Sequence, residues 1–378
     1  MKVESNTNNH QPIRIAHIIG NWFGGGVEAV VMNYYRHIDR TRIQFDFLCS
    51  ENSTNIPYDE IEDLGGRVYL IPNYTKISKY QKELIKIFKE NKYKIVHSHI
   101  NTLSVFSLHA AKKAGVPVRI AHSHSTTNKA EWKKNIIKQC LRPFSKIYAT
   151  DYFACSELAG RWLFGNKTYN DGKVYILNNA IDVDKFDFNE EIRKKKRKEL
   201  NIEDGTLVIG HVGRFVAQKN HKKLIEIFNE VHKQNRDTIL LLAGQGPLMD
   251  KIKKQVNESG LKNSVIFLGQ RSDINELYQA FDVFVLPSLY EGLPVSGIEA
   301  QAAGLPCVFS NNMTKETRVL ESTKFLSLEK TQKEWANAII GEAKKFLRRE
   351  KKDEITSHNF NINVEAKKIE KIYERVEK

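Results

Sequence analysis

The chain has 378 residues, of which 41% are hydrophobic and 28% charged, a balance typical of folded globular proteins. This length is enough for two domains that each bury a core of their own, and the net charge is +14. The polar amino terminus and the absence of any run of about 18 apolar residues indicate neither a signal peptide nor a membrane-spanning helix. Four widely spaced cysteines without a CxxC pair are expected to be reduced core residues of a cytoplasmic protein.

Short apolar runs alternate with amphipathic segments through the first half of the chain. This alternation predicts βαβ units and a parallel, doubly wound sheet. The predicted strands of this half cover residues 13–20, 43–49, 67–71, 94–99, 118–123, 151–156 and 173–177. The predicted helices between them include residues 27–38, 78–91 and 103–114.

Almost all of the excess positive charge lies between Lys76 and Lys146, where 16 lysines and arginines face three glutamates, a local net charge of +13. Residues 128–144 predict a helix with one apolar face and a lysine-rich remainder. The apolar face holds Trp132, Ile136, Ile137, Cys140, Leu141 and Phe144. A helix of this kind suits the anionic inner surface of a cell membrane, and an ordinary core-facing helix is the alternative. The concentration of charge favours peripheral membrane attachment.

The same alternation begins again after residue 180. Its predicted strands cover residues 206–213, 238–244, 264–269, 282–287 and 306–310. Two runs of one architecture predict two Rossmann-like domains, residues 1–180 and 181–360, in an α/β fold. Between the two runs, the basic segment from Arg193 to Lys198 indicates a solvated helix face.

In open parallel sheets, ligands bind where the strands end and loops lead into helices. The stretch "GNWFGGGVEAVV" directly follows the first strand, and its glycines, including Gly25 and Gly26, allow close approach of a ligand to the backbone. A flexible turn without a ligand is the alternative. The stretch "HVGRFVAQKNH" follows the strand at 206–212, and its Arg214 and Lys219 form a suitable clamp for a diphosphate. Two surface cations that serve solubility are the alternative.

The stretch "SLYEGLPVSGIEAQAAGLP" carries two carboxylates, Glu291 and Glu299, separated by seven small or apolar residues. Pro294 suits the first turn of a helix, so Glu291 is expected at the helix entrance and Glu299 inside it. Two carboxylates that bracket a helix amino terminus can bind hydroxyl groups while backbone amides hold a phosphate, which together describe a sugar nucleotide. The alternative is that Glu291 interacts with the helix dipole and that Glu299 is an exposed helix residue.

These motifs resemble those of retaining glycosyltransferases of family four, which have the GT-B fold with two Rossmann-like domains that face a central cleft. The similarity rests on the E-x(7)-E block, the basic pair of Arg214 and Lys219, the "GGGVE" turn and the segment "LNNAIDVDKF". It covers residues 13 to 378. It implies that a final helix at 361–378 packs back on the first domain. The subfamily similarity points to enzymes of bacterial capsule, exopolysaccharide or lipopolysaccharide synthesis.

The resemblance also implies roles for individual residues. Glu291 would contact the donor sugar, Glu299 the ribose hydroxyls, and the basic pair would neutralise the leaving diphosphate in place of a metal. His122 matches the histidine near the anomeric centre, and His124 is close enough to be confused with it on the acceptor side. The remaining donor-binding residues implied are Gly25, Gly26, Gly213, Gly244, Gln245, Gln270, Arg271, Gly292, Leu293 and Pro294.

Two patterns that suggest a metal are expected to be without one. Asp182 and Asp184 form a DxD pattern, but they lie in the interdomain segment. The pair His97 and His99 could form a metal site with His122 and His124, but no carboxylate or cysteine has a suitable spacing to join them.

The sequence therefore predicts a metal-independent, retaining transfer of a hexose or N-acetylhexosamine from a UDP-sugar to a lipid-linked or growing saccharide. The uridine base is the least determined part of this prediction. A nucleotide-sugar epimerase of the same architecture is one alternative. A basic protein that binds nucleic acid is another, and it is disfavoured because no module of that kind is visible and the strand-end motifs would have no role.

Overall fold

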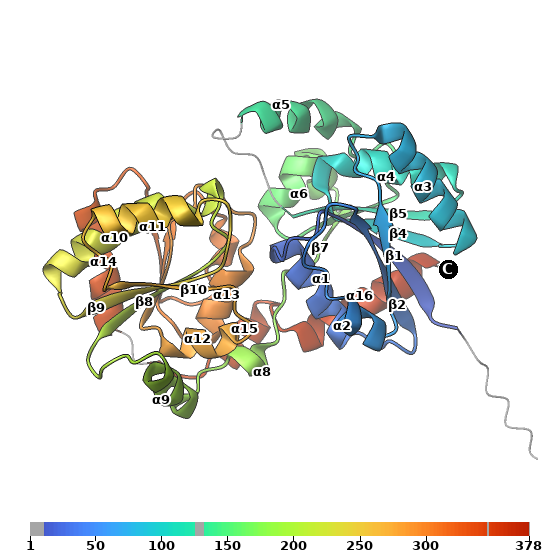
Figure 1. Ribbon diagram of the computed structural model, residues 1–378. Helices are drawn as coiled ribbons and strands as arrows, with labels where there is room; N and C mark the ends of the chain where they lie inside the picture. Colours follow the sequence, from blue (N-terminus) through green and yellow to red (C-terminus); the bar gives the residue numbers. More distant parts are fainter. Residues whose placement is uncertain (1–10, 125–131, 346–347, 378) are drawn as a thin grey trace, which may run out of the picture. The chain divides into compact units, whose positions relative to one another are not determined.

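The computed structural model describes residues 11–124, 132–345 and 348–377, which form two compact units (Figure 1). The first unit comprises residues 11–124, 136–177 and 365–377, and the second comprises residues 132–135 and 178–364. The chain thus passes into the second unit between residues 177 and 178, and its last segment returns to the first.

The first unit is built on a parallel sheet of seven strands in the order β3-β2-β1-β4-β5-β6-β7, as counted over the described residues. The strands are β1 (Ile13–Gly20), β2 (Ile43–Ser50), β3 (Arg67–Ile71), β4 (Ile95–Ser98), β5 (Val118–Ser123), β6 (Asp151–Ala154) and β7 (Val174–Ile176). The order reverses between β1 and β4, where His17 pairs with His97 in register. A reversal of this kind is where doubly wound sheets bind ligands.

Helices cover both faces of this sheet. On one face, Leu84, Leu108 and Leu163 of α3, α4 and α6 pack in a core with Ala16 and Val96 of the strands. On the other face, residues of α1 and α16 lie against β1 and β4. The helices of this unit are α1 (Gly26–His37), α2 (Tyr58–Asp63), α3 (Ile77–Glu90), α4 (Ser104–Lys113), α5 (Trp132–Leu141), α6 (Glu157–Phe164), α7 (Asn166–Asn170) and α16 (Ile362–Glu377), of which α5 and α16 begin within the second unit.

The second unit has a parallel sheet in the order β10-β9-β8-β11-β12-β13, again over the described residues. Its strands are β8 (Leu207–Val212), β9 (Thr238–Ala243), β10 (Val265–Gly269), β11 (Val283–Leu286), β12 (Cys307–Ser310) and β13 (Thr323–Leu326). The two parallel-sheet domains confirm the predicted α/β fold. The last strand, β13, was not predicted from the sequence.

Two cores fill the faces of this second sheet. One is formed with α10, α11 and α14, and the other with α12 and α13 (Figure 1). The helices of this unit are α8 (Val183–Phe186), α9 (Glu190–Glu199), α10 (His221–Gln234), α11 (Met249–Glu258), α12 (Ile274–Ala280), α13 (Val295–Ala302), α14 (Gln332–Lys345) and α15 (Lys352–Ser357).

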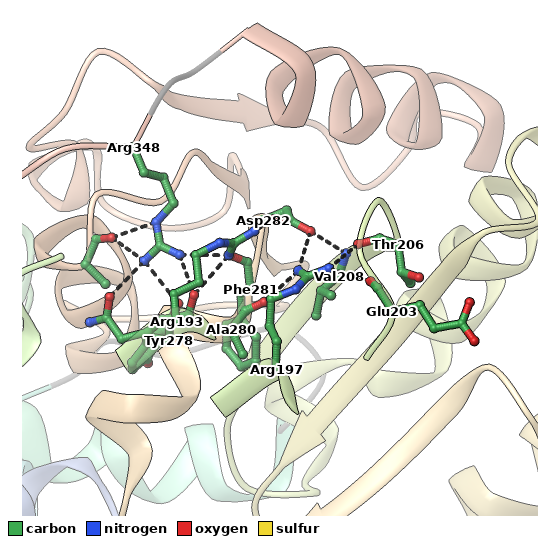
Figure 2. A network of polar contacts seen from close by, with 12 residues as sticks. Arg193, Arg197, Glu203, Thr206, Val208, Tyr278, Ala280, Phe281, Asp282 and Arg348 are labelled. Atoms are coloured by element: carbon green, nitrogen blue, oxygen red, sulfur yellow. Dashed lines mark hydrogen bonds and ion pairs between the residues drawn. The ribbon is translucent and has the colours of Figure 1, made fainter. Parts of the chain in front are cut away.

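The basic segment of α9 is only in part the solvated face that the sequence indicated: Lys194, Lys195 and Lys198 are exposed, but two cations are buried. Lys196 is 3% exposed and Arg197 is 8% exposed, because their charges meet partners inside the unit. Lys196 Nζ lies 2.8 Å from a carboxylate oxygen of Asp273. Figure 2 shows the guanidinium groups of Arg193 and Arg197 around the carboxylate of Asp282. The prediction was wrong for these buried cations because a run of charges in the sequence does not show which partners neutralise them.

A third guanidinium joins this group from the carboxyl-terminal part of the chain. Arg348 donates to the backbone carbonyls of Gln279, Phe281 and Ala303 (Figure 2). Burial and the neighbouring Arg193 lower the pKa of Arg348 to about 9. The carbonyl oxygens thus accept hydrogen bonds from a guanidinium that forms no ion pair with a carboxylate among the described residues.

Two further expectations concern the cysteines and the basic amphipathic helix. Cys49, Cys155 and Cys307 are buried, but Cys140 is exposed and was wrongly expected in the core. On the apolar face predicted for the basic helix, the side chains of Trp132 and Ile137 lie outside the described residues. No helix in the described part of the chain is both long and apolar enough to cross a bilayer.

Candidate active site

The end of β8 places the predicted cations in one short turn. Gly213 and Arg214 follow the strand directly, and Lys219 ends a single 3-10 turn before α10 begins. Asn220 closes that turn in the left-handed conformation, with φ of +54°, which asparagine tolerates better than most residues. Its Nδ2 donates to the carbonyl of Pro287 at 3.0 Å, so the loop after β8 is tied to the loop after β11.

Glu291 lies in that second loop and is 7% exposed. Its Oε1 lies 2.8 Å from Lys219 Nζ and accepts a hydrogen bond from Ser288 Oγ at 2.9 Å. Its Oε2 accepts from Gln218 Nε2 at 2.9 Å. The structure therefore brings together Lys219 and Glu291, which are distant in sequence, and adds two polar partners that the sequence analysis missed. Three donors hold this carboxylate in one orientation.

Glu299 lies inside α13, where Tyr278 Oη donates to its Oε2 at 2.9 Å. Burial raises the pKa of Glu299 to about 7, against the opposing effects of Tyr278 and Lys219. The loop between the two glutamates enters α13 at Pro294, which has no N–H group to offer a ligand. The amides available at this entrance are therefore those of Gly292, Leu293 and the first helical residues, since first-turn amides lack partners within the helix.

The ends of β8, β9 and β10 are joined by backbone hydrogen bonds. Gly213 N donates to the carbonyl of Ala243 at 3.0 Å, and Gly244 N to that of Gly269 at 2.7 Å. Gly244 has φ of +134°, and a Cβ there would lie 2.2 Å from the carbonyl oxygen of Gly213. No other residue fits this close approach. Gly213, Gly244 and the neighbouring Gln245 therefore lie at one edge of the sheet, as the strand-end prediction requires.

Gln270 and Arg271 follow the end of β10. The guanidinium of Arg271 binds the carboxylate of Asp273 at 2.6 and 2.7 Å and lies 3.6 Å from Glu199. Its side chain, 32% exposed, is thus paired with carboxylates of its own unit.

In the first unit, the glycine turn after β1 is closed by its own glutamate. Glu28 Oε1 accepts from the backbone N–H of Phe23 at 3.1 Å, and a Cβ on Gly25 would lie 2.9 Å from Glu28 Oε2. Gly26 opens α1 and has no neighbouring atom within 4 Å of a Cβ position. The turn therefore keeps free space beside the amino terminus of α1, on the side of Gly26.

Five histidines of the first unit line one small cavity of about 10 Å³, room for a single water molecule. His17 comes from β1, His97 and His99 from the end of β4, and His122 and His124 from the end of β5. His122 lies within its strand and is 1% exposed, whereas His124 follows the strand and is 8% exposed. The sequence analysis missed His17, although its register with His97 follows from the doubly wound order.

Two sets of these histidines, His17 with His97 and His99, and His99 with His122 and His124, each bring ring nitrogens within 4.8 Å of one another. Such spacing is compatible with a metal ligand set, but no carboxylate or cysteine belongs to either set among the described residues. Their imidazoles also hydrogen-bond to each other.

The other metal pattern weighed from the sequence is the DxD of the interdomain segment. Asp182 lies 3.1 Å from Lys185 Nζ, and Asp184 lies 2.5 Å from Lys352 Nζ. Each of these carboxylates is thus neutralised by a lysine.

Comparison with known proteins identifies the family of this chain. Residues 24–185 match the family described as Glycosyltransferase Family 4, and residues 192–361 match the one described as Glycosyl transferases group 1. The chain is 37% identical over 337 residues to the putative glycosyltransferase EpsF of Bacillus subtilis, with 88% of each chain covered. The chain is a family-four glycosyltransferase.

A second relative is the UDP-Gal:alpha-D-GlcNAc-diphosphoundecaprenol alpha-1,3-galactosyltransferase of Escherichia coli. It is 29% identical over 315 residues, with 80% of each chain covered. Among solved structures, Anabaena HepE in complex with UDP-glucose superposes with a TM-score of 0.73 at 18% identity, over 94% of each chain. That similarity shows the shared fold. This family-four enzyme thus has the two-domain GT-B architecture that its sequence predicted.

Proposed function

We propose that this glycosyltransferase moves a hexose or N-acetylhexosamine from a UDP-sugar to a lipid-linked or growing saccharide, with retention at the anomeric carbon, in the synthesis of a cell-surface polysaccharide. The Escherichia coli relative, whose name specifies a UDP-galactose donor and a diphosphoundecaprenol-linked acceptor, supports both substrate classes. The fold shared with HepE, which binds UDP-glucose, supports the choice of a UDP-sugar.

One observation supports the proposal most directly. Lys219 and Glu291 meet at 2.8 Å beside the entrance of α13, and Glu299 lies within the same helix. A cation, the first-turn backbone amides of a helix and two carboxylates at one sheet edge match a ligand that carries both a diphosphate and sugar hydroxyls. We assign Glu291 to the donor sugar, Glu299 to the ribose hydroxyls, and Arg214 with Lys219 to the diphosphate.

The chemistry follows from these roles. The bond between the anomeric carbon and the β-phosphate oxygen breaks, and an acceptor hydroxyl forms the new bond on the same face of the sugar. Its proton passes to the departing phosphate oxygen. Arg214, Lys219 and the amides at the entrance of α13 stabilise the negative charge that develops on the diphosphate, so the proposed reaction needs no metal.

Of the two histidines weighed from the sequence, we propose that His124 contacts the substrate and that His122 lies behind it. The supporting observation is burial: His124 follows β5 and keeps 8% of its surface, whereas His122 is 1% exposed within the strand. In parallel sheets the ligand-binding groups come from the residues after the strand.

We further propose that the first unit binds the inner surface of the cell membrane, where a lipid-linked acceptor would lie. Ile136, Phe144 and Ile147 are exposed by 54%, 49% and 55%, in the same segment as the lysines Lys138 and Lys146. Apolar side chains beside cations favour the surface of an anionic bilayer. Liposomes with anionic lipid should sediment the protein at low salt, and binding that does not depend on lipid charge would contradict this part of the proposal.

The assay for transfer uses the full chain, radiolabelled UDP-sugars and a diphosphoundecaprenol-linked saccharide, with and without EDTA. Transfer by the wild type should continue in EDTA. Lys219→Ala should lose about a hundredfold or more in kcat, the usual effect of removing one group that stabilises transition-state charge. Lys222→Ala, which removes an exposed lysine three residues away, is the matched control. Wild-type turnover in Lys219→Ala would contradict the assigned site.

A further inference from the structure

A chain of three imidazoles runs across the first sheet and ends at His124. His17 Nδ1 lies 2.9 Å from His99 Nε2, and His99 Nδ1 lies 2.9 Å from His124 Nε2. All three side chains are buried, with exposures of 1%, 4% and 8% from His17 to His124. A separate chain runs alongside it from Tyr373 through His97 to His122, and no hydrogen bond joins the two chains among the described residues.

The burial of these rings fixes how many protons the chain holds. Burial lowers the pKa of His17 and of His124 to about 3, and lowers that of His99 well below its usual range. Each ring is therefore neutral at physiological pH and carries one N–H group. With two hydrogen bonds between three neutral rings, the N–H groups of the chain donate either all toward His124 or all toward His17.

The inner end of the chain selects one direction. His17 Nε2 is buried and has no hydrogen-bond partner among the described residues. If the N–H groups donate toward His17, this nitrogen carries a buried proton without an acceptor. If they donate toward His124, this nitrogen carries only a lone pair. Orphaned buried N–H groups are the rarer of the two, so the protons lie on Nδ1 of His17, His99 and His124.

His124 is also held through its backbone. Its N–H donates to Asn101 Oδ1 at 2.8 Å, and Asn101 lies three residues after the end of β4 in the left-handed conformation, with φ of +51°. The ring and the main chain of His124 are thus anchored from the same short segment after β4, through His99 and Asn101. A side chain fixed at both points has little freedom to rotate.

We propose that His99, backed by His17, is a positioning residue that fixes the tautomer and ring orientation of His124 and makes its Nδ1–H a hydrogen-bond donor to a substrate oxygen. This inference rests on the proposed function, in which His124 contacts the substrate. It assigns to His124 the role of a donor rather than a base, because its Nε2 lone pair is occupied by His99. A donor in a neutral ring suits the stabilisation of charge on an oxygen during transfer.

Selective ¹⁵N labelling of histidine tests the tautomer without any substrate. Long-range ¹⁵N–¹H spectra of the wild type should show His124 with its proton on Nδ1. His99→Leu should remove that preference, while His99→Asn, whose amide nitrogen takes the place of Nδ1, should keep it. Tyr373→Phe removes a buried hydroxyl from the other chain and should leave His124 unchanged. A wild-type His124 protonated on Nε2, or an unchanged tautomer in His99→Leu, would overturn the proposal.

Kinetics separate positioning from general damage to the fold. His99→Leu should lower kcat by about tenfold to a hundredfold with little change in KM for the donor, because a small misplacement of a reacting group has effects of this size. His99→Asn should restore most of the loss, and equal losses in both variants would count against the role of the N–H group. An inactive wild type, in contrast, would contradict the proposed function while the spectra still report on the tautomer.

A metal is the competing explanation of the cluster, since His99, His122 and His124 could serve as ligands. Titration of the EDTA-treated protein with Co²⁺ and Zn²⁺ distinguishes the two. We expect no stoichiometric binding and no Co²⁺ visible absorption that depends on His99. Binding of one equivalent that is lost in His99→Leu would overturn the positioning role in favour of a metal site.

Discussion

Acid should unfold the first unit at a higher pH than is usual for a domain of its size. The perturbation is a decrease in pH from 7.5 to 5, and it acts on five buried histidines. Burial lowers the pKa of His17 and His124 to about 3 and lowers those of His97, His99 and His122 well below the usual range. The folded unit therefore cannot take up protons that the unfolded chain binds.

The sign and size of the effect follow from linkage. An unfolded histidine has a pKa of about 6.5, so its contribution to stability is complete above that pH and is lost as the pH falls toward the folded value. Each histidine loses about 1.4 kcal/mol per pH unit in this window, or about 2 kcal/mol at pH 5. Five independent groups would lose about 10 kcal/mol, which is comparable with the whole stability of a typical domain.

Urea unfolding at pH 7.5, 6.5, 6.0 and 5.5, with hydrogen exchange as the method of detection, measures this loss for each unit separately. The slope of unfolding free energy against pH should approach five protons for the first unit. His17→Asn, which keeps a donor at the Nδ1 position, should reduce the slope by about one proton. His358→Asn, at an exposed histidine, is the control. A stability that stays flat down to pH 5.5 would refute the reasoning.

Four further outcomes are expected in the second unit. Because burial raises the pKa of Glu299 to about 7, KM for the donor should fall as the pH rises from 6 to 8 and the carboxylate forms, and Glu299→Gln should remove that dependence. Glu291→Gln should keep a folded protein in circular dichroism while kcat falls by about a hundredfold or more. Gly244→Ala should lower the unfolding free energy by more than about 2 kcal/mol in urea, since its Cβ would meet a carbonyl, whereas Gly26→Ala has open space and should not. Asp282→Asn should destabilise this unit by about 3–5 kcal/mol in the same assay, because buried guanidinium groups lose their carboxylate.

The alternation of apolar and amphipathic segments was sufficient to predict both sheets. The strands of a parallel sheet that is buried on both faces are continuous apolar runs, and the helices between them are amphipathic, so both are visible in the sequence. The strand β13 (Thr323–Leu326) was missed because it is four residues long, lies at the edge of its sheet and has only two apolar residues, Phe325 and Leu326. A short edge strand carries less apolar character than a central one.

The partners of the candidate site were harder to predict than its members. Ser288 stands three residues before Glu291, a spacing that turn geometry could have suggested. Tyr278 reaches Glu299 from a different helix, α12, and nothing in its local sequence marks it as polar in function. Contacts between elements depend on sheet order and helix placement, which sequence periodicity does not report.

The histidines show why this limit matters for function. His97, His99, His122 and His124 were visible as a pattern, but their spacing alone allowed only a metal site or no site. His17 turns the pattern into a directed chain, because it sits on the strand that pairs with β4 and ends in a nitrogen without a partner. The direction of the chain, and so the proton that His124 presents, depends on one buried atom more than 80 positions earlier in the sequence.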